Sequence, residues 1–124
     1  VLYCIGERAE EQENWQEVLE KQLTTGLAGA DLTKVTIGYE PVWAIGPGKT
    51  PPGKEYMEMI GKYIKKVMGD VDVVYGGGLK KENAAMVSSV AELDGGLIAL
   101  TRFQGEIGFY PEEYLEIIDK YMGE

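Results

Sequence analysis

The sequence contains no histidine and a single cysteine, Cys4. Without histidine, the chain cannot form a Ser-His-Asp or Cys-His nucleophile pair, and it lacks the usual zinc ligands. One cysteine excludes an internal disulfide framework and suits a reducing compartment, so the sequence predicts a cytoplasmic protein. We expect no metal and no organic cofactor.

Positive charge is also scarce, with 12 Lys and Arg against 21 Asp and Glu and a formal net charge of −9. This acidic balance argues against nucleic acid and anionic membranes as partners. No apolar run approaches the roughly 18 residues of a membrane span. The length of 124 residues and the hydrophobic fraction of 44% are typical of one globular unit with a modest core.

Short apolar runs alternate with helical patterns at the intervals expected of βα units. These predicted strands are Val1–Ile5, Val35–Tyr39, Val71–Tyr75 and Gly96–Leu100. Near-continuous apolar strands belong to a parallel sheet that is covered on both faces. Four such units fit either an open doubly wound sheet or half of a (β/α)8 barrel, since a full barrel needs about 250 residues.

Apolar residues at helical spacing predict helices between these strands and after the last one. One stripe runs from Trp15 to Leu23 and another from Tyr56 to Val67. A shorter helix is expected near 82–90, and the last begins at Pro111, because proline suits the first helical position.

The segment that follows the second predicted strand carries the clearest chemical signal. Glu40 ends the strand, and a loop follows that consists of Pro41, Val42, Trp43, Ala44, Ile45, Gly46, Pro47, Gly48, Lys49 and Thr50. A solvated loop has little reason to carry so many apolar residues, whereas a lid must expel water when it closes over a substrate. Under such a lid, Glu40 could act as a general base near neutral pH. A salt-bridged glutamate at a strand end is the alternative.

Tyr39–Thr50 resembles the catalytic glutamate and flexible lid of the triosephosphate isomerase family. Further matches are Cys4-Ile5-Gly6-Glu7 to the end of the family's fifth strand, Tyr75-Gly76-Gly77 to its seventh-strand phosphate loop, and Asp94-Gly95 with Leu97-Ile98 to its eighth strand. The order and spacing match over essentially the whole chain. The resemblance therefore implies an α/β fold of four consecutive βα units, the C-terminal half of a TIM barrel.

We expect residues 1–124 to be a single unit from a chain of about 250 residues. The apolar run that begins at Val1 also favours a fragment, because natural termini are usually surface segments. A processed N-terminus is the alternative.

The resemblance implies an aldose–ketose isomerase that interconverts dihydroxyacetone phosphate and glyceraldehyde 3-phosphate, with Glu40 moving the proton. It also implies a homodimer when the protein is complete. The family's electrophilic His and its Asn-Lys pair come from the first half of the barrel. Two alternatives remain open: an isomerase of a tetrulose phosphate or related sugar phosphate, and a catalytically incomplete half-barrel with only a structural or association role.

The resemblance further assigns a phosphate cradle. Backbone N–H groups near Gly46 and Gly78 would point at the phosphate, although the family usually has Ser at the position of Gly78. The hydroxyl of Tyr75 would latch the lid. Ala99 and Leu100 occupy the positions of two phosphate-binding glycines, and this departure puts the triose specificity in doubt.

The loop Thr101–Phe109 is longer and more polar than the family norm. Arg102 within it is expected either to bind phosphate or to pair with Glu106. Five lysines are expected to lie on solvated surfaces: Lys21, Lys65, Lys66, Lys80 and Lys81.

Two residues near the first strand complete the candidate site. Cys4 is expected to be a small buried apolar residue, with a role beside Glu40 as the alternative. Glu7 is expected to form a polar pair with Arg8, and the resemblance suggests that it holds Trp43 or the hinge of the lid.

Overall fold

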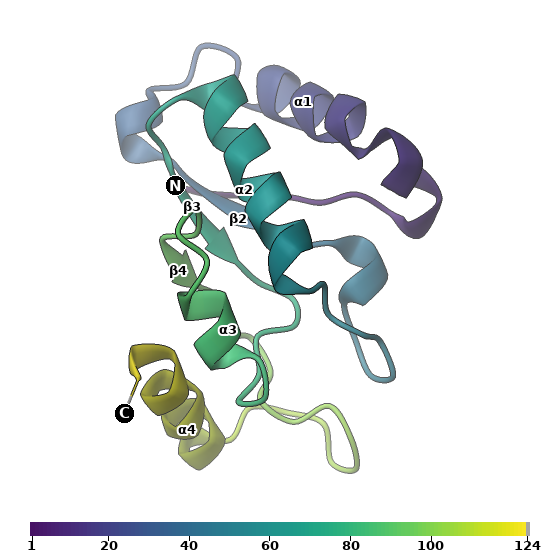
Figure 1. Ribbon diagram of the computed structural model, residues 1–124, viewed down its shortest axis with the longest axis vertical. Coiled ribbons are helices and arrows are strands. Elements are labelled where there is room, and N and C mark those ends of the chain that lie inside the picture. The colour runs from purple at the N-terminus through teal and green to yellow at the C-terminus, as the bar shows by residue number, and fades with distance from the viewer. Residues whose placement is uncertain (124) are drawn as a thin grey trace.

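The computed structural model describes residues 1–123 (Figure 1). One parallel sheet contains four strands in sequence order: β1 (Leu2–Ile5), β2 (Thr36–Tyr39), β3 (Asp72–Tyr75) and β4 (Gly95–Gly96). Helical segments connect each strand to the next. The predicted α/β fold of four consecutive βα units, consistent with half of a TIM barrel, is confirmed.

The predicted helices are present at the predicted places. They are α1 (Trp15–Gly26), α2 (Lys54–Met68), α3 (Ala84–Ser88) and α4 (Pro111–Met122), with three short 3-10 turns, η1 (Ala9–Asn14), η2 (Leu32–Lys34) and η3 (Val42–Ala44). Pro111 is the first residue of α4, and Gly123 ends this helix with a positive φ of 81°. Helix α3 is shorter than the expected 82–90. None of the helices within residues 1–123 is long and apolar enough to cross a membrane.

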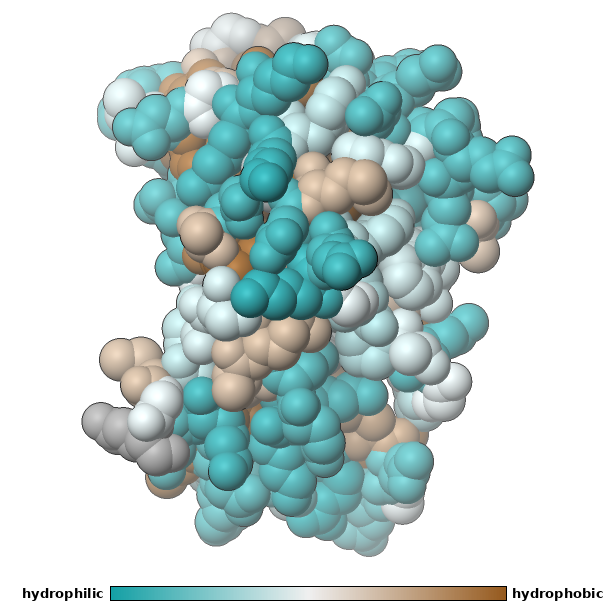
Figure 2. Space-filling model, in the orientation of Figure 1, coloured by the Kyte–Doolittle hydropathy of each residue, from teal (hydrophilic) through white to brown (hydrophobic). Residues whose placement is uncertain are grey.

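The core lies between the sheet and the helices that cover one of its faces. Alternate strand residues, Ile37, Tyr39, Val73 and Tyr75 among them, are fully buried together with Leu19, Leu23, Ile60 and Ile64 of α1 and α2. Burial of each such side chain stabilises the fold by roughly 1.5–3 kcal/mol. The outward faces of these helices are largely hydrophilic (Figure 2).

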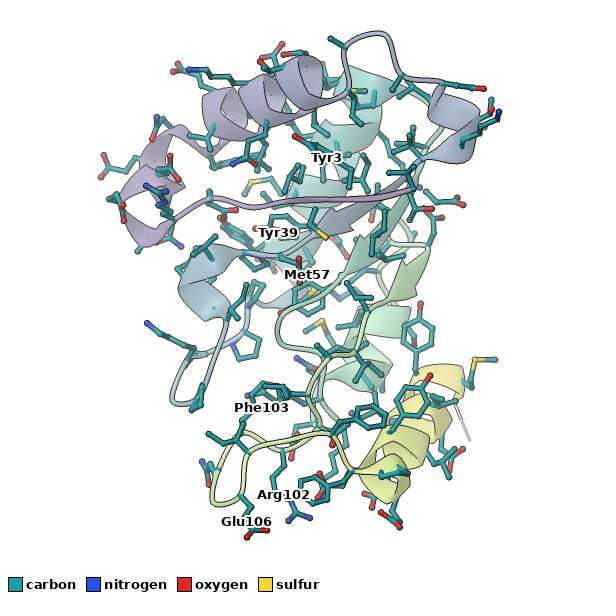
Figure 3. All side chains as sticks on the ribbon, turned by 180° about the vertical axis from the view of Figure 1, so that it is seen from behind. Tyr3, Tyr39, Met57, Arg102, Phe103 and Glu106 are labelled. Carbon is teal, nitrogen blue, oxygen red and sulfur yellow. The ribbon has the colours of Figure 1, made fainter. Side chains whose placement is uncertain are left out.

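The opposite face of the sheet is open to solvent within the described chain (Figure 3). Leu2 on this face is 45% exposed, and Cys4 is exposed as well. The expectation of a sheet covered on both faces, and of a buried Cys4, is therefore wrong for residues 1–123. The reason is geometric, because no segment of this part of the chain packs against that face.

The fourth strand is shorter than the expected Gly96–Leu100. Only Gly95 and Gly96 pair with β3, which itself ends at Tyr75. The chain then enters a hairpin, in which the backbone N–H groups of Thr101 and Arg102 donate to the carbonyl oxygen of Gly108. The backbone groups of Thr101 and Arg102 therefore pair within the hairpin and not with β3, and β4 ends early.

The strand register brings the carboxyl ends of the strands level with one another. Ile5 pairs with Tyr39, Tyr39 with Tyr75, and Tyr75 with Gly96. The N–H of Glu40 then donates to the carbonyl of Ile5 at 2.8 Å, which keeps the next residues close to the sheet. The segments that follow the strands therefore meet at one edge.

Candidate active site

Glu40 lies against glycines at the ends of the neighbouring strands. A Cβ on Gly76 would lie 3.3 Å from Cγ and Oε2 of Glu40, and one on Gly77 would lie 2.6 Å from Cγ1 of Ile45. A Cβ on Gly6 would overlap the carbonyl oxygen of Glu40. The close approach of these strand ends to the candidate base therefore depends on residues without side chains.

A cavity of about 120 Å³, which we call the inner cavity, opens beside Glu40. Six residues singled out by the sequence line it together: Glu40, Ile45, Gly46, Gly78, Ala99 and Leu100. Gly77, Leu79, Ile98 and Phe103 complete the lining. The sequence did not reveal Leu79, Ile98 or Phe103 as site residues, because isolated apolar residues near strand ends carry no chemical signal. The cavity thus has one carboxylate and a largely apolar wall.

Glu7 is fully buried and accepts hydrogen bonds from three aromatic side chains. The Tyr39 hydroxyl lies 2.9 Å from each carboxylate oxygen, the Trp43 indole Nε1 donates at 3.0 Å, and the Tyr56 hydroxyl donates as well. Burial and the neighbouring Glu7 carboxylate raise the pKa values of Tyr39 and Tyr56 well above the usual value, so both hydroxyls keep their protons. The hydrogen bonds from these donors offset the free-energy cost of removing the carboxylate from water.

Glu7 also contacts the start of the predicted lid through its backbone. The N–H of Val42 donates to the carbonyl oxygen of Glu7 at 3.0 Å. Trp43 also packs edge-on against Tyr56, with ring centroids 5.6 Å apart. Among the described residues Glu7 forms no ion pair with Arg8, so that part of the expectation is wrong.

The lid segment is anchored at its start and exposed towards its tip. Pro41 and Ala44 are buried, whereas Val42 and Ile45 are 49% and 40% exposed. Pro47, Gly48, Lys49 and Thr50 are all exposed. Gly46 and Gly48 have positive φ values of 106° and 76°, a conformation that favours glycine.

Tyr75 is fully buried, and its hydroxyl has no hydrogen-bond partner among the described residues. Burial raises its pKa well above the usual value. A Cβ on Gly78 would lie 2.8 Å from this hydroxyl oxygen. The expected latch group therefore sits against the candidate phosphate loop without a bond to the lid in this arrangement.

The exposed Cys4 is a neighbour of Glu40. Partial shielding from water, a hydrogen bond to Glu40 and the negative charge of Glu40 together raise the pKa of the Cys4 thiol to about 11. The thiol is therefore protonated at neutral pH and is a weak nucleophile.

Arg102 pairs with a residue that the sequence did not suggest. Its Nε and Nη2 donate to Oε1 of Glu113 at 3.0 Å and 2.7 Å, and its guanidinium lies 3.7 Å from the ring centroid of Tyr110. The expected pairing with Glu106 is wrong, because the hairpin turns the guanidinium towards α4. Arg102 also does not line the inner cavity beside Glu40.

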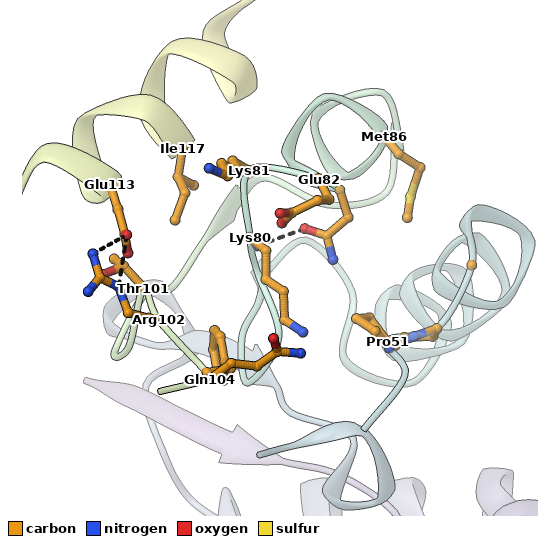
Figure 4. A pocket seen from close by; sticks show the side chains of 14 residues that line it. Pro51, Lys80, Lys81, Glu82, Met86, Thr101, Arg102, Gln104, Glu113 and Ile117 are labelled. Carbon is orange, nitrogen blue, oxygen red and sulfur yellow. Dashed lines mark hydrogen bonds and ion pairs between the residues drawn. The ribbon is translucent and has the colours of Figure 1, made fainter. Parts of the chain in front are cut away.

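A second cavity of about 640 Å³, the outer cavity, lies next to the hairpin (Figure 4). Its walls come from the segment after the predicted lid, the loop before α3, α3 itself, the hairpin and α4: Pro51, Pro52, Gly53, Lys80, Lys81, Glu82, Asn83, Met86, Thr101, Arg102, Phe103, Gln104, Glu113 and Ile117. The ammonium of Lys80 lies 4.7 Å from the ring centroid of Phe103.

Three of the five lysines expected on solvated surfaces thus have specific neighbours. Besides Lys80, Lys65 pairs with Asp94 at 2.8 Å and Lys81 with Glu116 at 3.5 Å. Partners contributed by distant segments cannot be read from the sequence. Within residues 1–123, no group of three His, Cys, Asp or Glu side chains converges to hold a metal ion.

Parallel βα units with a cavity at the carboxyl ends of the strands define a segment of a barrel of the (β/α)8 class, in which active sites occupy this edge. A family profile described as triosephosphate isomerase matches residues 1–120. The chain belongs to the triosephosphate isomerase family.

Curated relatives named triosephosphate isomerase support this assignment. One from Dehalococcoides mccartyi is 37% identical over 116 residues, which cover 85% of this chain and 46% of the relative. One from Geobacter metallireducens is 40% identical over 112 residues, covering 79% and 44%. One from Treponema denticola is 39% identical over 131 residues, covering 94% and 50%. The chain therefore spans about half the length of the curated relatives that it matches.

Proposed function

We propose that this chain is the C-terminal half of an isomerase that interconverts a ketose phosphate and an aldose phosphate, with Glu40 as the general base. The observation that supports this most strongly is the inner cavity, where Glu40 faces Gly46 and Gly78 across a largely apolar wall. A carboxylate in such surroundings, next to a loop that can exclude water, suits proton abstraction from carbon.

In the proposed reaction, the Glu40 carboxylate removes a proton from the carbon next to the carbonyl. An enediolate forms, and the same carboxyl group returns the proton to the neighbouring carbon, so no cofactor and no external oxidant is required. Backbone N–H groups near Gly46 and Gly78 would hold the phosphate, because glycine lets the main chain approach closely. Stabilisation of the developing oxyanion must come from residues outside this chain.

We further propose that the complete protein has about 250 residues, or that two copies of this half associate. Three observations support this: the coverage of about half of each relative, the open face of the sheet, and the outer positions of β1 and β4. A homodimer of the complete protein and a cytoplasmic location follow from the family resemblance and the single cysteine, and both stay predictions.

The alternative substrate is a tetrulose phosphate, and one observation favours it. Leu100 lines the inner cavity at a position where the family has a phosphate-binding glycine. A branched side chain at this position crowds the phosphate. A half-barrel without catalysis is the second alternative, and the lack of an electrophilic group in this chain supports it.

The reaction class can be tested by hydrogen exchange in the complete protein. The protein is incubated with dihydroxyacetone phosphate or erythrulose 4-phosphate in deuterium oxide, and deuterium at the reacting carbons is followed by NMR. We expect incorporation and aldose formation with at least one substrate, and neither with Glu40→Gln. Absence of both with the unaltered protein would exclude the isomerase and favour the association role.

A further inference from the structure

Phe103 lies between the two cavities. Within residues 1–123, it is the one residue that lines both the inner cavity of about 120 Å³ and the outer cavity of about 640 Å³. Its side chain is half-buried. A residue shared by two neighbouring cavities that have no other lining in common forms the partition between them.

The two sides of this partition differ in polarity. Among the described residues that line the inner cavity, Glu40 is the only charged one, and the others are glycines and apolar residues. Charged and polar side chains make up more than half of the lining of the outer cavity. Polar walls around a space of this size bind water. The Phe103 ring therefore separates the candidate base from a space that holds water.

The hairpin fixes the backbone next to Phe103 against α4. Arg102 donates two hydrogen bonds to Oε1 of Glu113, at 3.0 Å and 2.7 Å, as Figure 4 shows. Its guanidinium lies over the ring of Tyr110, and the backbone N–H of Tyr110 donates to Oγ1 of Thr101 at 2.8 Å. These contacts join both strands of the hairpin to the first turn of α4.

The anchor also sets the direction of the Phe103 side chain. Neighbouring side chains in an extended segment point to opposite sides, so Arg102 held against α4 turns Phe103 the other way. Figure 3 shows Phe103 on the side of the hairpin that faces the sheet and Arg102 on the far side. The ammonium of Lys80 lies 4.7 Å from the Phe103 ring centroid, and a cation over an aromatic face is attracted to it. The ring is therefore held both by its own backbone and by the loop before α3.

We propose that Phe103 keeps the water of the outer cavity away from Glu40 during turnover, and that Arg102 and Glu113 are positioning residues that hold Phe103 in place. This inference rests on the proposed isomerase function and adds to it a water-excluding wall that is not part of the lid.

The wall acts while Glu40 holds the proton taken from the substrate carbon. Water that reached the carboxyl group in this interval would exchange that proton for one from the solvent before its return to the neighbouring carbon. The Phe103 ring therefore favours direct return of the same proton.

The test follows this proton during turnover of dihydroxyacetone phosphate or erythrulose 4-phosphate by the complete protein in deuterium oxide. The first aldose formed carries deuterium where Glu40 exchanged its proton and hydrogen where the return was direct. Phe103→Ala should raise the ratio of deuterated to undeuterated aldose about tenfold, the effect of lowering the barrier to water entry by roughly 1.4 kcal/mol. Phe103→Leu keeps an apolar side chain and should raise the ratio less.

Phe109→Ala is the matched control for the loss of the ring. Phe109 belongs to the same hairpin and packs against Tyr114, with ring centroids 5.3 Å apart, but it lines neither cavity. This variant should leave the ratio unchanged. An unchanged ratio in Phe103→Ala, or an equal rise in Phe109→Ala, would overturn the proposal.

Arg102→Met tests the positioning role. This variant should also raise the ratio, and adding Phe103→Ala to it should change the ratio little further, because the two residues act as one unit. Amide hydrogen exchange over residues 103–109 should become faster. Lys81→Met is the control, since it removes another ion pair to α4, between Lys81 and Glu116, and should alter neither measurement. Unchanged amide exchange in Arg102→Met, or additive effects of the two substitutions on the ratio, would reject the positioning role.

The same experiment separates this inference from the proposed function. If the unaltered protein forms no aldose from either substrate, both are rejected. Aldose formation with a deuterium ratio that Phe103→Ala leaves unchanged would retain the proposed function and reject this inference alone.

Discussion

The indole of Trp43 donates a 3.0 Å hydrogen bond to Glu7, a residue 36 positions earlier in the chain. This contact joins the first turn of the lid to the end of β1. Because Glu7 is fully buried, each of its donors stabilises a charge that has no access to water. The start of the predicted lid is thus attached to the segment that follows β1.

The substitution Trp43→Phe should therefore lower both the stability of the fold and the turnover that depends on the predicted lid. The substitution keeps the ring contact with Tyr56 but leaves Glu7 with one donor fewer, which should lower the free energy of unfolding of the complete protein by about 1–3 kcal/mol. Urea denaturation measures this, and turnover should fall in parallel as the hinge loosens. Trp15→Phe is the control, since Trp15 packs edge-on against Tyr63, with ring centroids 5.2 Å apart, and makes no hydrogen bond to Glu7. Equal losses of stability and of turnover in Trp43→Phe and Trp15→Phe would reject the hinge role.

Gly77→Ala tests the close approach of the lid to β3. Gly77 combines a φ of 87° with a site where a Cβ would lie 2.6 Å from Ile45. Gly29 has a similar φ of 78° and nothing within 4 Å of a Cβ, so Gly29→Ala isolates the backbone strain. Both variants should lose roughly 1–2 kcal/mol of stability from the left-handed backbone. Only Gly77→Ala should also reduce turnover, and unchanged turnover in this variant would contradict the packing of Ile45 against the glycine loop.

Stability should fall in alkaline solution because of the fully buried Tyr39 and Tyr75 and the half-buried Tyr56. Burial raises the pKa values of Tyr39, Tyr56 and Tyr75 above the usual value of about 10. The native state therefore holds these protons more tightly than the unfolded state. The contribution of these protonated hydroxyls to the free energy of unfolding is complete below about pH 10 and is lost as the pH rises towards the native pKa values.

Urea midpoints measured across this alkaline range test the prediction. Tyr75→Phe removes one titrating group together with an unpaired buried hydroxyl, so it should leave neutral stability within about 0.5 kcal/mol and flatten the alkaline decline. A midpoint that stays constant above pH 10 would show that these hydroxyls are not buried. If Tyr75 also latches the lid, the same variant should lower turnover.

Much of the fold could be predicted from local pattern. The 3.6-residue period of Tyr56–Val67 defines α2, and the first three strands begin within a residue of the predicted positions. Part of the lining of the inner cavity could also be predicted. The order of Glu40, Gly46, Gly78 and Leu100 along consecutive βα units places these residues at one edge of a parallel sheet.

The remaining features depend on partners that are distant in sequence. The pairing of Arg102 with Glu113 requires the hairpin that shortens β4, and its bend is set by backbone hydrogen bonds rather than by side-chain pattern. Exposure of Cys4 depends on which segment covers the open face of the sheet. The contact of Lys80 with the Phe103 ring joins two loops that are distant in sequence, so local sequence pattern could not predict it.

The most direct test of the central proposal is the turnover of the complete protein carrying Glu40→Gln, measured on dihydroxyacetone phosphate and erythrulose 4-phosphate. The glutamine retains the volume of the glutamate but cannot accept the proton. We predict an unchanged melting temperature and a kcat lowered by roughly 10²–10⁴-fold, with a partial loss in Glu40→Asp because the carboxylate is withdrawn from the substrate. Full turnover in a folded Glu40→Gln protein would contradict the assignment of Glu40 as the base.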